Sequence, residues 1–259
     1  MSIERKTIAG GAISATFITQ IGEADKHGRQ FTPEQLSQDA DVGKTLSDFI
    51  AAATTSIHMA IYDFRLQGKA GDEVIGALNH AAQNGIDVRI AYFQTNKKPT
   101  PEDFALIGGD PGVVDDGLGG AQFDGSVKTK GIVEDLPEGK LVPPVVGEPI
   151  TAPHNLMHSK YIVRDGMTDR AAVLMGSANF TDDAWSVQDN NILILDKCHE
   201  LSAYYENDFS EMWQSGHISN TGNFDTASVE VGGVPIQVMF APGRGRQIGA
   251  EIGARIDTA

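Results

Sequence analysis

Residues 158–181 carry a set of polar side chains whose types and spacing suit chemistry on a phosphate diester. In chain order they are a histidine, a lysine, a carboxylate, a hydroxyl and an amide: His158, Lys160, Asp165, Ser177 and Asn179. A neutral imidazole can attack phosphorus and form a covalent phosphohistidine. A lysine and hydrogen-bond donors beside it can stabilise the charge on the phosphate oxygens. The segment therefore predicts a phosphoryl-transfer site centred on His158.

The spacing also predicts how these side chains are positioned. Residues 157–163 alternate in character, as in a strand, where residues two apart point to the same side. His158 and Lys160 should then project side by side. Residues 171–175 form a short apolar run that predicts a second strand, and Gly176 and Ser177 interrupt it. Ser177 and Asn179 should lie where this strand ends, at the edge of a sheet where ligands often bind.

The pattern H-x-K-x(4)-D followed by G-S-x-N resembles the central motif of the phospholipase D superfamily. The resemblance implies a catalytic site built from His158, Lys160 and Asp165, with Lys160, Ser177 and Asn179 binding the substrate phosphate. It also implies that two such motifs meet across a pseudo-two-fold axis, so that a second histidine protonates the leaving alcohol. Because lysine supplies the positive charge, we expect no metal and no cofactor.

One feature departs from the pattern of that superfamily, in which an acidic residue shortly after G-S-x-N orients the imidazole. Here the corresponding stretch is Gln188-Asp-Asn-Asn191. We expect Asp189 to orient His158, with Gln188 and Asn190 as alternatives. A zinc site at His154 and His158 is disfavoured, because the segment has strand character and lacks a following glutamate.

Composition limits the range of partners. The chain has 259 residues, a formal net charge of −15 and a single cysteine, Cys198. An acidic surface repels polyanions, so a nuclease would need a local basic groove, for which Lys97-Lys98 and Lys128–Lys130 are the candidates. One cysteine excludes a disulfide framework and a cysteine-based metal site. The sequence shows no signal peptide and no transmembrane segment, which predicts a soluble, cytoplasmic protein.

Hydrophobic periodicity predicts a mixed α/β fold of phospholipase D-like type, with a mostly parallel sheet and helices on both faces. The expected strands cover 15–20, 56–62, 87–93, 157–163, 171–175, 192–195 and 236–240. The expected helices cover 41–53, 72–84, 199–215 and 249–259, with Asp41 and Asp72 as the caps of the first two.

Internal similarity predicts the domain organisation. Residues 43–53 align without gaps on 249–259, which suggests the beginning of a second repeat. We therefore expect residues 1–218 to form one motif-bearing repeat, 219–234 a linker, and 235–259 the start of a truncated second repeat. Residues 94–154 lack regular patterning and are interpreted as an insertion or lid over the site. The second histidine would come from a homodimer partner or from a missing repeat.

The leading functional hypothesis is a phospholipase D-like phosphodiesterase that hydrolyses or transfers phosphodiesters through a phosphohistidine on His158. Its substrate would be a phospholipid or another small diester. A nuclease of the same superfamily is the alternative, and a non-catalytic phosphate-binding relic is a further one.

Overall fold

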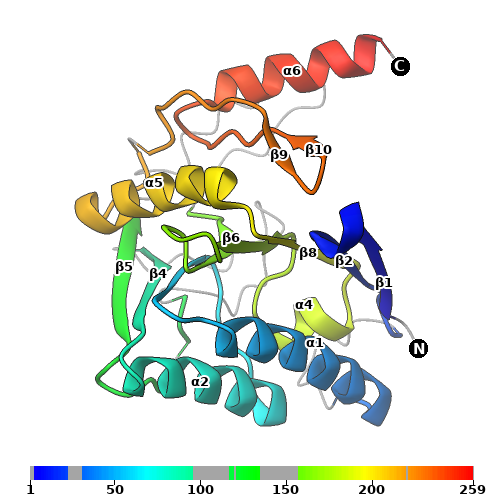
Figure 1. Cartoon of the computed structure of the whole chain (residues 1–259). Helices are drawn as coiled ribbons and strands as arrows, with labels where there is room; N and C mark the ends of the chain where they lie inside the picture. The colour runs from blue at the N-terminus through cyan, green and yellow to red at the C-terminus, as the bar shows by residue number, and fades with distance from the viewer. Residues whose placement is uncertain are drawn as a thin grey trace, which may run out of the picture.

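A mixed sheet of eight strands forms the centre of the protein, with helices on both of its faces (Figure 1). The computed structural model describes residues 3–22, 31–95, 117–119, 121–134, 157–219 and 221–258. The strand order is β1-β2-β8-β7-β6-β3-β4-β5. The strands are β1 (Ile3–Ile8), β2 (Ile13–Ile18), β3 (Ser56–Ile61), β4 (Asp87–Thr95), β5 (Lys128–Glu134), β6 (Lys160–Arg164), β7 (Ala172–Gly176) and β8 (Asn190–Asp196).

The sheet is mixed, and the expectation that it is mostly parallel is wrong. The pairs β3–β4 and β4–β5 are parallel, whereas the other pairs of neighbouring strands are antiparallel. The first parallel pair is the expected strand–helix–strand unit. Strands β6 and β7 are joined by a short connection, which brings the chain back antiparallel.

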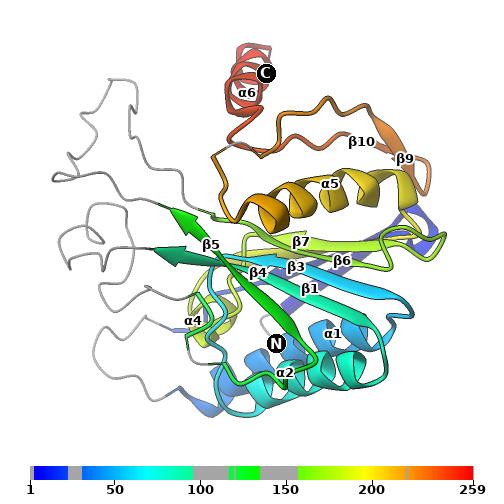
Figure 2. The same ribbon diagram turned by 90° about the vertical axis from the view of Figure 1, so that its left-hand side faces the viewer.

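Helices cover both faces, as predicted. Helices α1 (Pro33–Ala51), α2 (Gly68–Gln83) and α4 (Asp182–Ser186) lie on one face, and α5 (His199–Ser215) lies on the other (Figure 2). Strand alternation divides the core accordingly. Ile57, Met59 and Ile61 point towards α1 and α2, while Ala60 packs with the residues under α5. The sheet therefore packs between two apolar layers, one on each of its faces.

Helix α1 begins before the predicted cap at Asp41. Its N-cap is Thr32, whose hydroxyl accepts a hydrogen bond from the backbone N–H of Gln35. The Gln35 side chain accepts in return from the backbone N–H of Thr32, and Pro33 occupies the first helical turn. This capping box satisfies two amide groups that the helix itself leaves unpaired.

Part of the predicted insertion belongs to the sheet. Strand β5 pairs in parallel with β4 along its whole length, and the buried side chains of Leu118 and Val127 join the core under α2. The remaining long stretches of the predicted insertion, residues 96–116 and 135–156, lie outside the described residues. The prediction of a lid over the site therefore stays a prediction.

The C-terminal part contains a small hairpin and a final helix. Strands β9 (Val229–Val231) and β10 (Val234–Ile236) pair antiparallel at the end of the predicted linker, and Val229 and Val231 belong to the same apolar cluster as α5. The expected strand at 236–240 is reduced to its first residue. Helix α6 (Gly245–Asp257) has no buried residue, and Ile252 and Ile256 are exposed. A second repeat beginning here stays a prediction.

Candidate active site

His158 and Lys160 lie where the chain enters β6, beside the end of β3. The backbone N–H of Tyr62 donates to the carbonyl of Ser159 at 2.8 Å, and this bond fixes the segment before the strand. The Lys160 ammonium donates to the carbonyl of His158 at 2.9 Å. The Tyr62 ring contacts both side chains: its centroid lies 4.7 Å from that of His158 and 5.2 Å from Lys160 Nζ. The two side chains are therefore neighbours, as the strand alternation predicts.

A cavity of about 440 Å³ opens beside these two residues. Residues of β6, β7, β8, α5 and the chain after β10 form its wall, and most of this wall is apolar. The lining residues include Met175, Leu193, Tyr205, Ile218, Met239 and Phe240. His158 is the one histidine among the lining residues of the described chain.

The environment of His158 favours the neutral imidazole. Burial and then the positive charge of Lys160 lower the pKa of His158 to about 4. The residue is nevertheless exposed, so a substrate can reach the ring. A neutral ring at pH 7 has a free lone pair, which a nucleophile needs.

Lys160 is the cation of the site, and its side chain is largely buried, with 9% of its surface exposed. Burial lowers the pKa of Lys160 to about 8, and the nearby carboxylate of Asp63 opposes that shift. Asp63 is itself held by a two-pronged ion pair with Arg65, with both N···O distances at 2.7 Å. At neutral pH Lys160 remains mostly protonated, and it can stabilise a phosphate oxygen.

Ser177 and Asn179 follow directly after β7, but they do not line the cavity. The Ser177 hydroxyl donates to Asn190 Oδ1 at 2.8 Å and accepts from the backbone N–H of Asn191 at 3.0 Å. Within the described residues, Asn179 Oδ1 is buried and has no hydrogen-bond partner. The roles of Ser177 and Asn179 in phosphate binding stay predictions.

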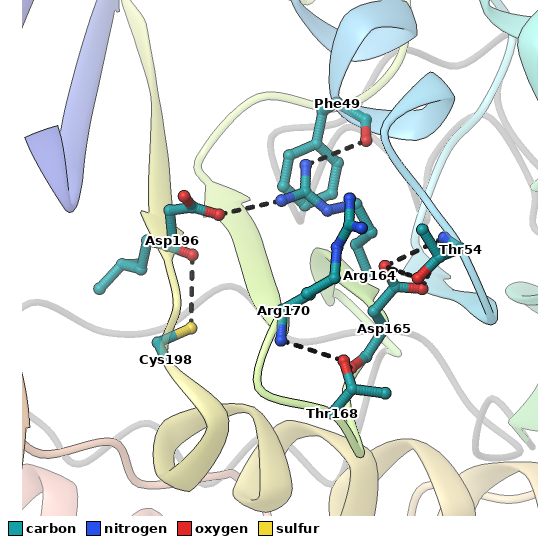
Figure 3. A network of polar contacts seen from close by, with 9 residues as sticks. Phe49, Thr54, Arg164, Asp165, Thr168, Arg170, Asp196 and Cys198 are labelled. Carbon is teal, nitrogen blue, oxygen red and sulfur yellow. Dashed lines mark hydrogen bonds and ion pairs between the residues drawn. The ribbon is translucent and has the colours of Figure 1, made fainter.

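The structure does not bring Asp165 together with His158 and Lys160. Asp165 follows the far end of β6, and a rise of about 3.3 Å per residue puts it about 16 Å from Lys160 along the strand. Its fully buried carboxylate accepts hydrogen bonds from the backbone N–H groups of Thr54, Thr55 and Ser56. Figure 3 shows the contact with Thr54. Burial raises the pKa of Asp165, but these hydrogen bonds outweigh it and hold the pKa below its usual value. This residue ties the loop before β3 to β6.

The candidates for orienting His158 lie elsewhere in the structure. Asp189 is exposed, and its Oδ1 accepts from the backbone N–H of Gln20 at 2.8 Å. The amide of Asn190 donates to the carbonyl of Ala184 and to Gln188 Oε1. None of these three residues is hydrogen-bonded to the His158 ring in the described part of the chain. The orienting role of Asp189 stays a prediction.

Comparison with protein families now decides the assignment. Residues 46–213 match the family described as "Cardiolipin synthase, PLD-like domain". The chain belongs to this PLD-like family. The match includes both the strand–helix–strand unit and the motif around His158, and it confirms the resemblance drawn from the sequence.

Solved structures similar to this PLD-like chain include two bacterial proteins named Nuc and NucT. Nuc from Salmonella typhimurium, a phospholipase D family member, is 16% identical with a TM-score of 0.45, and the match covers 82% of this chain and 95% of Nuc. NucT from Helicobacter pylori is 21% identical with a TM-score of 0.44, covering 69% and 91%. The phosphatidylserine synthase of Haemophilus influenzae is 14% identical with a TM-score of 0.40, covering 95% of this chain and 46% of its own. No curated protein matches the sequence.

One acidic residue of the cavity wall, Asp208, was not among the predicted site residues. Asp208 lies on α5 and lines the cavity, with 3% of its surface exposed. Its signal in the sequence is an acidic residue four positions after Tyr204 and directly before Phe209, on the apolar stripe of that helix. Burial raises the pKa of Asp208 to about 7, with a smaller upward contribution from Glu211, while the hydrogen bond from Tyr161 opposes the shift.

Proposed function

We propose that the protein is a phospholipase D-type phosphodiesterase that hydrolyses phosphodiesters or transfers their phosphoryl group to another alcohol. The observation that carries the proposal is the pairing of an accessible, neutral His158 with the buried ammonium of Lys160 at the mouth of one cavity. Membership of the PLD-like family supports the same class of reaction.

The proposed reaction has two steps. The free ring nitrogen of His158 attacks phosphorus, a P–N bond forms, and the P–O bond to the leaving alcohol breaks while that oxygen takes up a proton. Water or a second alcohol then attacks the phosphohistidine, loses its proton, and restores neutral His158. Lys160 stabilises the charge on the phosphoryl oxygens in both transition states.

Both steps need a group that gives and then takes back the proton. We assign it to a second histidine, from a partner copy of this chain or from a second repeat. The other described histidines are unsuitable, because none of them lines the cavity. His58, for example, is bound to Glu206 at 2.7 Å under α5. General acid–base assistance contributes about 10²–10⁴-fold to such reactions, so the donor matters for rate.

We further propose that the substrate is a phospholipid or another small diester. The apolar cavity wall supports this choice. The lysines that could form a nucleic-acid groove are occupied: Lys128 pairs with Asp87 at 2.7 Å, and Lys130 donates to the carbonyl of Trp213. Lys97 and Lys98 lie outside the described residues.

In the described part of the chain, no helix is both long and apolar enough to span a bilayer.

The test is turnover of bis(p-nitrophenyl) phosphate in EDTA by the wild type, His158→Ala, Lys160→Met and the control His199→Ala, which alters an exposed histidine at the start of α5. We expect activity in EDTA from the wild type and the control, and a loss of at least about 10³-fold in the other two. Light scattering on the same samples gives the mass of the active species.

Each outcome has a distinct meaning. Turnover that survives in His158→Ala would refute the histidine mechanism. An active dimer would place the second histidine in a partner copy. A folded wild type that binds phosphate but shows no turnover would support the non-catalytic alternative, and efficient cleavage of single-stranded DNA would support the nuclease.

A further inference from the structure

Among the described residues that line the cavity, Asp208 is the one with a carboxyl group. Oδ2 of this group accepts a hydrogen bond from the Tyr161 hydroxyl at 2.8 Å. Lys160 lines the same cavity from β6. These two are the charged lining residues in the described chain, apart from the titratable ring of His158. The cavity therefore has one cation where the phosphate would bind and one carboxyl in the α5 wall.

Tyr161, the hydrogen-bond partner of this carboxyl, belongs to a row of three contacting aromatic side chains. The ring centroids of Tyr161 and Tyr205 are 5.0 Å apart, and those of Tyr205 and Phe240 are 5.1 Å apart, both pairs meeting edge to face. All three residues line the cavity. Aromatic faces attract cations and give no compensating contact to an anion, so they reinforce the sign preference of the carboxylate.

We propose that Asp208 is a specificity-determining residue that makes the cavity select diesters whose ester group is cationic or neutral and reject those with a second negative charge. The proposal rests on the phosphodiesterase function above and refines its substrate class. A polynucleotide carries a further phosphate close to the scissile one, so the same residue disfavours nucleic acid.

The physical basis is the low exposure of the carboxyl. With 3% of its surface in contact with solvent, Asp208 is screened little by water, so a charge placed in the cavity interacts with it strongly. The titratable groups that interact with it are Tyr161 from β6, and Tyr205 and Glu211 from its own helix. His158 and Lys160 line the same cavity. Because burial raises the pKa of Asp208 to about 7, the selection should be strong at pH 8 and weak at pH 5.5.

The experiment uses three methyl phosphodiesters of similar size and different charge. They are methyl phosphocholine, its uncharged isostere methyl 3,3-dimethylbutyl phosphate, and the anionic methyl 3-carboxypropyl phosphate. Their dissociation constants are measured at pH 8 by calorimetry and as inhibition constants against bis(p-nitrophenyl) phosphate. We expect affinity to fall by about tenfold at each step from cation to neutral ester to anion, the range of a hydrogen-bonded charge.

Two variants, and a repeat of the measurement at pH 5.5, test whether Asp208 causes this order of affinities. In Asp208→Asn the three constants should agree within about threefold, whereas the control Glu200→Gln, which removes an exposed carboxylate from the same helix, should keep the wild-type series. Tyr161→Phe removes the hydrogen bond that favours the carboxylate, so its series should appear only at higher pH.

The outcomes separate this inference from the proposed function. Three equal constants in the wild type at pH 8, or an unchanged series in a folded Asp208→Asn variant, would overturn the role of Asp208 even if turnover is normal. A charge series measured by calorimetry without any turnover would support the subsite and contradict the phosphodiesterase proposal.

Discussion

At the scale of single residues, the site depends on two opposite protonation states held side by side. In the proposed mechanism His158 must be neutral to attack phosphorus, and Lys160 must be charged to stabilise the phosphoryl oxygens. Burial and their mutual repulsion lower the pKa of the histidine to about 4, and burial lowers that of the lysine to about 8. The pKa of Lys160 therefore remains above that of His158. Between about pH 4 and pH 8 the histidine is neutral while the lysine is charged.

This arrangement predicts the pH dependence of kcat/KM. Activity should rise as the pH increases through about 4, because His158 loses its proton, and it should fall as the pH increases through about 8, because Lys160 loses its own. Rates measured from pH 3.5 to 10 test this. In Lys160→Arg the remaining activity should lack the alkaline fall, because arginine stays protonated. An alkaline limb that is unchanged in that variant would assign it to another group.

At the scale of elements, strand β6 connects the site to the scaffold. Lys160 lies at its beginning, and Asp165 follows its end, where it binds the loop that leads into β3. Because β3 and β6 are neighbours in the sheet, the same strand pair positions Tyr62 against His158. The motif therefore includes residues that we propose to react and one residue that holds the strands in place.

This division predicts a stability effect without a specific catalytic one. Asp165→Ala leaves the amide groups of Thr54, Thr55 and Ser56 without their acceptor, and it should lower the free energy of unfolding by about 3 kcal/mol. Urea unfolding measures this change, and Asp169→Ala, at an exposed site, is the matched control. The pH limits of kcat/KM should not move. A stable Asp165→Ala protein with shifted limits would give Asp165 a catalytic role.

The local hydrophobic pattern of the sequence predicted the elements near the site. The elements that it did not predict depend on contacts between residues far apart in the chain. The alternation at 157–163 correctly made His158 and Lys160 neighbours, although the strand begins only at Lys160. The start of α1 was missed because its polar residues are buried by distant partners: the Gln38 amide, for example, donates to the carbonyl of Trp185. Strand β5 was missed because its alternating lysines resemble a loop, yet they are paired with other elements.

The direction of the sheet could not be read from the sequence, because a hydrophobic pattern gives the face of a strand and not its neighbour. Asp165 illustrates the same limit at the site. Its place in the motif suggested a catalytic role, and only the fold shows that its partners are the amides of 54–56, more than a hundred residues earlier. Asp208 required the fold as well, because only the packing of α5 against β6 brings it to the cavity.

At the scale of the whole molecule, a strongly acidic protein has its reactive residues at a cavity that is mostly apolar. The net charge of −15 and the paired lysines of β5 both disfavour a polyanionic substrate. The exposed isoleucines of α6 align with Leu46 and Ile50, which are fully buried in α1. A second repeat that begins at this helix stays a prediction.

The central claim, a covalent phosphohistidine on His158, is tested most directly by mass spectrometry. The protein is mixed with bis(p-nitrophenyl) phosphate for a fraction of one turnover, quenched in alkaline denaturant to preserve phosphohistidine, and digested. We predict one p-nitrophenylphosphoryl group on the peptide that contains His158, and none in His158→Ala. A reaction that proceeds without any adduct on this peptide, or an adduct on another residue, would contradict the account.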